Sequence, residues 1–216
     1  MLALYRSTIG KKIIMAVTGI IGIVFVILHM AGNLQAFAGA KKLNDYAAIL
    51  HGPLADVVLV QRVVLVIAVV LHVLMAWQLT AQSRRARPVA YAIRQPQVTT
   101  WAARTMRWGG VFLLLFIVVH ILHFTTLDLD RSFVALDAYG NVVRAFTNPW
   151  VTLFYLAAMV FLGLHIYHGA WSSPRTLGVA PVSRWPLRRK AALGLALVLW
   201  LGFSAVPAAV FLGLVK

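Results

Sequence analysis

The sequence predicts an all-α, polytopic membrane protein with five transmembrane helices, arranged as a single domain over residues 1–216. The first reason is composition: 62% of the residues are hydrophobic and 12% are charged, which is more apolar than a soluble domain. The second is that apolar residues gather in stretches long enough to cross a hydrocarbon core, which needs about 20 residues. The third is that no alternating β-barrel pattern is visible, so each stretch is expected to be a helix. The stretches cover about residues 13–31, 57–81, 108–126, 150–171 and 191–215.

The first stretch has to be distinguished from a secretory signal. Basic residues precede it, and the small-residue sequence AFAGA follows at 36–40, as at a cleavage site. Its apolar run of about 18 residues is longer than a usual signal core, and cleavage would remove His29. We therefore interpret it as an uncleaved first span. Tryptophans mark the ends of the other spans, as interfacial anchors do: Trp77, Trp101, Trp108, Trp150, Trp171 and Trp185.

The charged residues predict the topology. The formal net charge is +15, and most basic residues lie before the first span, between the second and third, and between the fourth and fifth. These segments share one side, so the positive-inside rule predicts a cytoplasmic amino terminus and an external carboxyl terminus. We attribute the excess charge to topology and to attraction by anionic membrane lipid, and not to nucleic acid. The opposite side is expected to hold Lys41, Lys42, a loop with Asp128, Asp130, Arg131, Asp137 and Arg144, and Lys216.

Four of the seven histidines, His29, His72, His120 and His165, fall one on each of the first four spans. An ionisable ring inside a membrane is costly unless it is bonded or liganded, so this recurrence indicates a function. Imidazoles on facing helices can hold a metal or haem inside a bundle. Because the chain has no cysteine, covalent haem attachment and iron–sulfur ligation by this chain are excluded.

The predicted topology gives each histidine a depth. At about 1.5 Å per residue, His29 and His120 lie in the outer half of the membrane, and His72 and His165 lie nearer the cytoplasmic face. We call His29 with His120 the outer pair and His72 with His165 the inner pair. Two depths with two imidazoles each are typical of two bis-histidine haems, which carry electrons because both axial positions are filled.

Five segments of the chain resemble a known family. The segments HMAGNLQAF (29–37), LNDYAAIL (43–50), QRVVLVIAVVLH with RRARPVAY (61–91), GGVFLLLFIVVHILHF (109–124) and FLGLHIYHGAWSSPRTLG (161–178) resemble the five-helix, di-haem cytochrome b anchor of bacterial succinate dehydrogenase and fumarate reductase. The resemblance extends over nearly the whole chain. It implies haem ligation by His29 with His120 and by His72 with His165, the same pairs that depth suggests.

The resemblance also bears on two neighbouring histidines. The family places a glycine four residues after the ligand, which selects His165, with Gly169, over His168. Depth slightly favours His123 as the partner of His29, whereas the family interval of ten residues from a glycine, here Gly110, selects His120. His123 and His168 remain the alternates.

The implied cofactors and partners follow from the family. They are two non-covalent haem b groups, a quinone (menaquinone or ubiquinone), and the flavoprotein and iron–sulfur subunits of a succinate:quinone oxidoreductase in the bacterial cytoplasmic (inner) membrane. The chain would serve the respiratory chain and the tricarboxylic acid cycle as a non-flavin subunit, and we find no dicarboxylate active site in it. One departure is that the chain has no glutamate, and Gly163 stands where some relatives have one. A glutamate proton route is therefore not expected.

Further site residues are predicted around the histidines and at the two ends of the spans. Gly19 and Gly22 share a helical stripe with His29, and Gly169 leaves room beside His165, so a flat macrocycle could lie there, although small residues also serve ordinary membrane helix packing. Arg62 is either an interfacial residue or a partner for a haem propionate. For the quinone, we consider Asn33, Gln35 and His51, together with Asp45, at the outer end. A cytoplasmic-side site near Ser83, Arg84, Trp101 and Arg104 stays open.

Two other classes of protein remain. One is the cytochrome b anchor of another respiratory complex, such as a hydrogenase or formate dehydrogenase, which also uses several intramembrane histidines. The other is a haem-free transporter or proton channel, which would usually show internal repeats or broken helices.

Overall fold

The five predicted spans are all present as long helices in the computed structural model, which describes residues 6–86, 101–130, 132–179 and 185–216. Each is long and apolar enough to cross a membrane, and no strand occurs among the residues described. The predicted all-α class with five spans is therefore confirmed. The long helices are α2 (Thr8–Asn33), α4 (Ala55–Arg85), α5 (Trp101–Phe124), α7 (Pro149–Thr176) and α8 (Trp185–Phe211).

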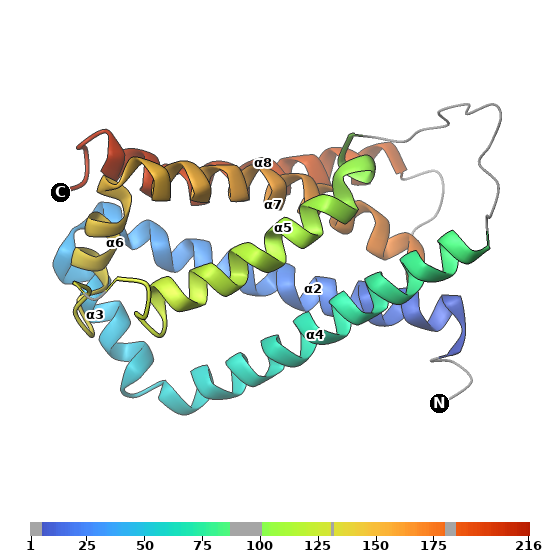
Figure 1. Cartoon of the computed structure of the whole chain (residues 1–216), viewed down its shortest axis with the longest axis horizontal. Helices are drawn as coiled ribbons and strands as arrows, with labels where there is room; N and C mark the ends of the chain where they lie inside the picture. The colour runs from blue at the N-terminus through green and yellow to red at the C-terminus, as the bar shows by residue number, and fades with distance from the viewer. Residues whose placement is uncertain (1–5, 87–100, 131, 180–184) are drawn as a thin grey trace.

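The long helices run along the long axis of the molecule, and α4 diverges from the others toward one end (Figure 1). Helix α7 packs against α2, α5 and α8, whereas α4 packs mainly against α2. The fully buried residue Leu199 marks the core between α7 and α8, together with Ile166 and Ala196. Many large apolar side chains elsewhere, such as Val60 and Leu115, are exposed, as expected of helix faces that contact lipid.

Three short helices gather at the end where α2 finishes: η1 (Leu34–Ala38), α3 (Ala40–His51) and α6 (Ala138–Thr147) (Figure 1). The sequence predicts a loop for part of this region, and that is wrong for residues 138–147, which form α6. Asp137 caps α6 by accepting a hydrogen bond from the Gly140 N–H at 3.1 Å. Asn44 joins α3 to α6: its amide donates to Asp137 at 3.0 Å and its oxygen accepts from the Tyr139 N–H at 2.9 Å.

Helix α5 begins earlier, and helix α8 ends earlier, than the predicted spans. Helix α5 begins at Trp101 rather than near 108, because polar residues of its first turns continue the helix beyond the membrane core. Helix α8 ends at Phe211, so the predicted end at 215 is wrong. Gly213 has a φ of 72°, and the Leu214 N–H bonds back to the Ala209 carbonyl at 2.8 Å, which closes the helix.

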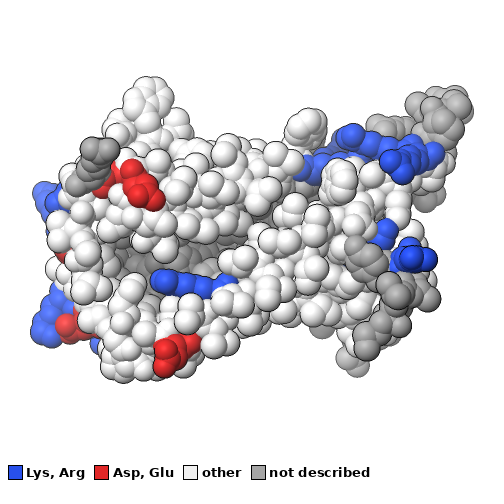
Figure 2. All heavy atoms as spheres, turned by 60° about the horizontal axis from the view of Figure 1, so that its bottom comes forward, with Lys and Arg blue, Asp and Glu red and all other residues white. Residues whose placement is uncertain are grey.

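Charged side chains differ between the two ends of the bundle: acidic residues gather at one end only, whereas Lys and Arg occur at both (Figure 2). We call the end where α2, α5 and α8 begin the basic end, and the opposite end, with α3 and α6, the aspartate end. The aspartate end carries every acidic residue of the chain: Asp45, Asp56, Asp128, Asp130 and Asp137. The basic residues that precede the third and fifth spans include Arg87, Arg94 and Arg184, which lie outside the described residues, as does Arg131.

Candidate functional site

The structure brings the four predicted histidines together as two pairs. The ring centres of His29, on α2, and His120, on α5, lie 5.8 Å apart. Those of His72, on α4, and His165, on α7, lie 6.1 Å apart. These are the outer and inner pairs defined above, and each pair joins two helices that are not neighbours in the sequence.

The two pairs lie at different levels of the bundle. Thr18 contacts His72 of the inner pair, and on the same helix it precedes His29 of the outer pair by 11 residues, about 16 Å of helix. The outer pair lies toward the aspartate end, where α2 finishes only four residues after His29. The inner pair lies toward the basic end.

Thr18 fixes the orientation of the inner-pair ring of His72. The Thr18 hydroxyl donates to the Ile14 carbonyl at 2.8 Å, and its oxygen lies 3.1 Å from Nδ1 of His72. With the hydroxyl hydrogen directed at a carbonyl, the threonine oxygen is available as the acceptor for a proton on Nδ1 of His72. The Nε2 atom of His72 then has a free lone pair, as a metal ligand requires.

A glycine lies beside each inner-pair ring, and only the one beside His72 is in tight contact with it. A Cβ atom at Gly19 would lie 3.2 Å from Cε1 of His72, and one at Gly110 would lie 3.9 Å from Cε1 of His165. A side chain at Gly19 would therefore make the His72 ring give by a few tenths of an ångström, a contact that the helical stripe alone does not reveal. Nδ1 of His165 is buried and has no hydrogen-bond partner within the described part of the chain.

The Tyr155 hydroxyl contacts both His120 and its neighbour His123, and the other ring contacts of the two histidines differ. The hydroxyl oxygen lies 3.4 Å from Nδ1 of His120 and 3.1 Å from Nδ1 of His123. The ring of His123 is buried and stacks on Phe133, with centres 5.1 Å apart. Since His120 is the one whose ring meets that of His29, the geometry favours His120 over His123 as the partner of His29.

Phenylalanine rings surround the outer pair. Phe25 stacks on His29 with centres 5.3 Å apart, and Phe116 stacks on His120 at 5.6 Å. Each precedes its histidine by four residues, so the i, i+4 spacing of a helix could have identified both from the sequence. Phe203, from α8, lies 5.8 Å from His29 and has no such signal.

The alternate histidine His168 contacts Trp171 on its own helix. The two ring centres lie 6.2 Å apart in an edge contact, and Nδ1 of His168 is buried without a partner among the residues described. Gly169, on the same helix, and Gly22, on α2, each face open space, because a Cβ atom at either position would have no atom within 4 Å of it. Both glycines could therefore border a bound group.

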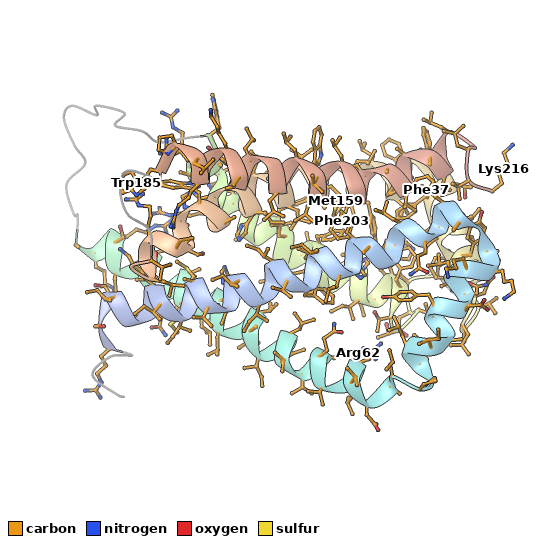
Figure 3. All side chains as sticks on the ribbon, turned by 180° about the vertical axis from the view of Figure 1, so that it is seen from behind. Phe37, Arg62, Met159, Trp185, Phe203 and Lys216 are labelled. Carbon is orange, nitrogen blue, oxygen red and sulfur yellow. The ribbon has the colours of Figure 1, made fainter. Side chains whose placement is uncertain are left out.

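Arg62 lies toward the aspartate end of α4, with its side chain on the side of the other helices (Figure 3). It is nevertheless exposed, because α4 diverges from the bundle there. Salt bridges in the described residues are confined to Lys41 with Asp45, so Arg62 has no carboxylate partner within that part of the chain.

The residues considered for a quinone at the aspartate end lie in three successive elements. Asn33 ends α2, Gln35 lies in η1, and the exposed His51 ends α3 with its Nδ1 2.9 Å from the Ala47 carbonyl. No hydrogen bond joins them in the described regions. At the basic end, Ser83 and Arg84 lie in the last turn of α4, and the Arg104 guanidinium stacks over Trp101 at 5.6 Å.

The histidine pairs fit a bis-imidazole metal group. Two imidazoles that bind opposite sides of one metal ion, each at about 2 Å, have ring centres about 6 Å apart. The observed separations are 5.8 and 6.1 Å. No group of three or more metal-ligating side chains occurs among the described residues, so each pair would need the remaining ligands from a cofactor such as a porphyrin.

Comparison with known proteins identifies no relative: no family model, no curated protein and no solved structure matches the chain.

Proposed function

We propose that this chain is the di-haem cytochrome b subunit that anchors a succinate:quinone oxidoreductase, a succinate dehydrogenase or fumarate reductase, in the bacterial cytoplasmic membrane. The observation that carries the proposal is the pairing of four histidines from four helices at two levels of one bundle. His29 and His120 would hold one haem b, and His72 and His165 the other.

The surroundings of the rings support this assignment. The hydrogen bond between Thr18 and His72 leaves Nε2 free to bind a metal, and an orienting partner of this kind is usual for metal-bound histidine. Arg62, exposed on the bundle side of α4 without a carboxylate partner in the described residues, is suited to a haem propionate. Haem with two axial imidazoles supplies reversible one-electron transfer.

The arrangement of the two pairs would define the path of the electrons, and the two ends of the bundle would define where the partner subunits and the quinone bind. The two levels, about 16 Å apart along α2, lead from the basic end toward the aspartate end. An iron–sulfur subunit, with its flavoprotein partner, would dock at the basic end, which we assign to the cytoplasmic side by the positive-inside rule. Quinone would react at the aspartate end, near Asn33, Gln35 and His51, or at the basic end near Ser83 and Arg104.

The test is affinity purification of the tagged chain from its native membrane, followed by identification of co-purifying subunits and a dithionite-reduced spectrum. We expect a flavoprotein and an iron–sulfur protein together with the sharp bands of low-spin haem b. Co-purification of hydrogenase or formate dehydrogenase subunits would show that the chain is the cytochrome b of another respiratory complex and not of a succinate:quinone oxidoreductase. A colourless preparation would reject the cytochrome and favour a haem-free transporter.

A further inference from the structure

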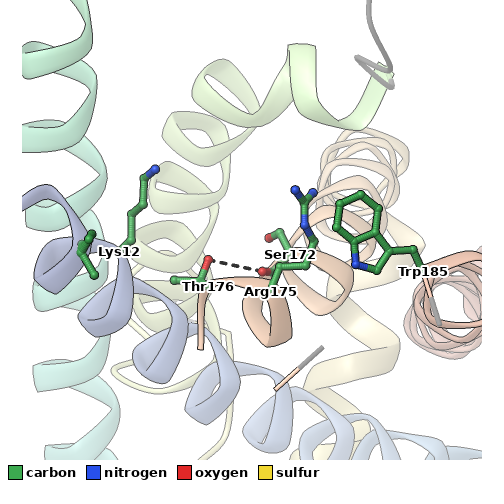
Figure 4. Close-up of a pocket in the computed structure, with 6 residues that line it drawn as sticks. Lys12, Ser172, Arg175, Thr176 and Trp185 are labelled. Carbon is green, nitrogen blue, oxygen red and sulfur yellow. Dashed lines mark hydrogen bonds between the residues drawn. The ribbon is translucent and has the colours of Figure 1, made fainter. Parts of the chain in front are cut away.

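A pocket of about 430 Å³ opens at the basic end, and no histidine lines it (Figure 4). Three helices form it near their ends. Its lining consists of Ile9 and Lys12 from α2, Ser172, Arg175 and Thr176 from α7, and Trp185 from α8.

Two lining residues, Arg175 and Trp185, belong to a stack of alternating guanidinium and indole groups that continues beyond the pocket lining. The Arg175 guanidinium carbon lies 4.2 Å from the Trp185 ring centre and 4.9 Å from that of Trp171. Arg189 lies over Trp171 as well, at 4.5 Å. Stacking on indole holds a guanidinium in place while leaving its N–H edge free to donate hydrogen bonds.

The positive charge of this stack has no counter-ion in the chain. All five acidic side chains, Asp45, Asp56, Asp128, Asp130 and Asp137, lie at the aspartate end, and so does the carboxyl terminus (Figure 1). Lys12 and Arg175 are exposed and Arg189 is partly buried, so an anion from outside the chain could reach all three without competition from a carboxylate of this chain.

The same cluster contains hydrogen-bond donors without acceptors. The indole N–H groups of Trp171 and Trp185 and Nε of Arg189 are buried and have no partner within the described residues. Buried donors are nearly always paired, so these three require an acceptor from outside the described chain. The hydroxyls of Thr176 and Ser172 make only long bonds to helix carbonyls, at 3.3 and 3.4 Å, which a stronger acceptor could replace.

We propose that this pocket binds the phosphate of an anionic membrane lipid. An oxyanion would carry the negative charge that balances the basic side chains, and its oxygens would accept hydrogen bonds from the unpaired donors. A lipid, rather than free phosphate, is favoured by the apolar stripe that continues from the pocket along α2. Ile9, Val17, Ile20 and Val24 are all exposed on this stripe, at intervals close to whole helical turns, and acyl chains could lie along it.

The test is native mass spectrometry of the purified, intact assembly with added phosphatidylglycerol, with phosphatidylcholine and inorganic phosphate as comparison probes. We expect phosphatidylglycerol to be retained at concentrations where phosphatidylcholine is not. Lys12→Gln and Arg175→Gln should each weaken its retention about five-fold, the effect of one basic residue beside an anionic lipid. Lys42→Gln is the matched control, because Lys42 is exposed on α3 at the aspartate end.

Arg175→Lys separates loss of charge from disruption of the fold. It keeps the positive charge but removes the guanidinium stack, and it should retain more lipid than Arg175→Gln. Equal retention of the two lipids, or variants indistinguishable from Lys42→Gln, would overturn the proposal. Displacement of the lipid by equimolar inorganic phosphate would instead indicate a free oxyanion site and overturn the assignment to lipid. Absence of lipid from the assembly, with a cross-link from position 12 to an acidic segment of another subunit, would indicate a protein partner and also overturn the proposal.

Discussion

The Thr18 hydroxyl oxygen lies 3.1 Å from Nδ1 of His72, across the interface between α2 and α4, while the hydroxyl itself donates to the Ile14 carbonyl at 2.8 Å. A hydrogen bond from Nδ1 to this oxygen selects one tautomer of a ring that faces His165. It therefore connects the packing of the first two membrane helices to the metal-binding capacity of the inner pair.

Replacing Thr18 with valine should weaken haem binding at the inner pair by about ten- to a hundred-fold, the usual cost of losing the partner of a metal-bound histidine. Thr18→Ser keeps the hydroxyl and serves as the control. Haem content and the potentiometric titration of each haem would be measured. An unchanged inner haem in Thr18→Val would show that the hydrogen bond is not needed for ligation.

A side chain at Gly19 should also disturb the inner pair. The Cβ of Gly19→Ala would lie 3.2 Å from Cε1 of His72, closer than nearly all such contacts, so the ring must shift. We expect a changed midpoint potential and reduced occupancy of the inner haem only. Gly194→Ala is the matched control, because no atom lies within 4 Å of the Cβ that it would add. A response of the outer haem instead would contradict the role given to Gly19.

Alanine at His120 should remove one low-spin haem per chain, whereas alanine at His123 should leave both haems six-coordinate. His120 faces His29 at 5.8 Å, but His123 is held by Tyr155 and Phe133. Electron paramagnetic resonance of the oxidised complex distinguishes the two results. Loss of the outer haem in His123→Ala, with retention in His120→Ala, would mean that depth and not the observed pairing identifies the ligand.

The absence of cysteine makes the topology directly measurable. Ser83→Cys, at the end of α4, should react only with reagents that reach the cytoplasm, and Ser132→Cys, after α5, only with reagents added from outside. The docking proposal adds that the partner subunits should shield position 83. The reverse labelling pattern would show that the bundle has the opposite orientation in the membrane. The inner pair would then lie near the external face, out of reach of a cytoplasmic electron donor.

The sequence predicts the elements that hydropathy controls and misses those that depend on contacts between helices. The five spans and the recurrence of one histidine per span follow from composition and spacing alone. Helices α3 and α6 escape prediction because they are short and partly polar, and Asn44 and Asp137 stabilise them through contacts across the fold. Thr18 and Tyr155 escape it because their roles depend on how each helix is rotated about its axis, which the apolar pattern of a membrane helix does not determine.

The central claim is that each histidine pair holds one haem, and its most direct test is the haem content of the purified assembly. Pyridine haemochrome analysis should give two non-covalent b-type haems per copy of this chain. His72→Ala and His29→Ala should each reduce the ratio to one, with loss of the inner and the outer haem respectively. A ratio near zero or one in the unaltered protein would contradict the account.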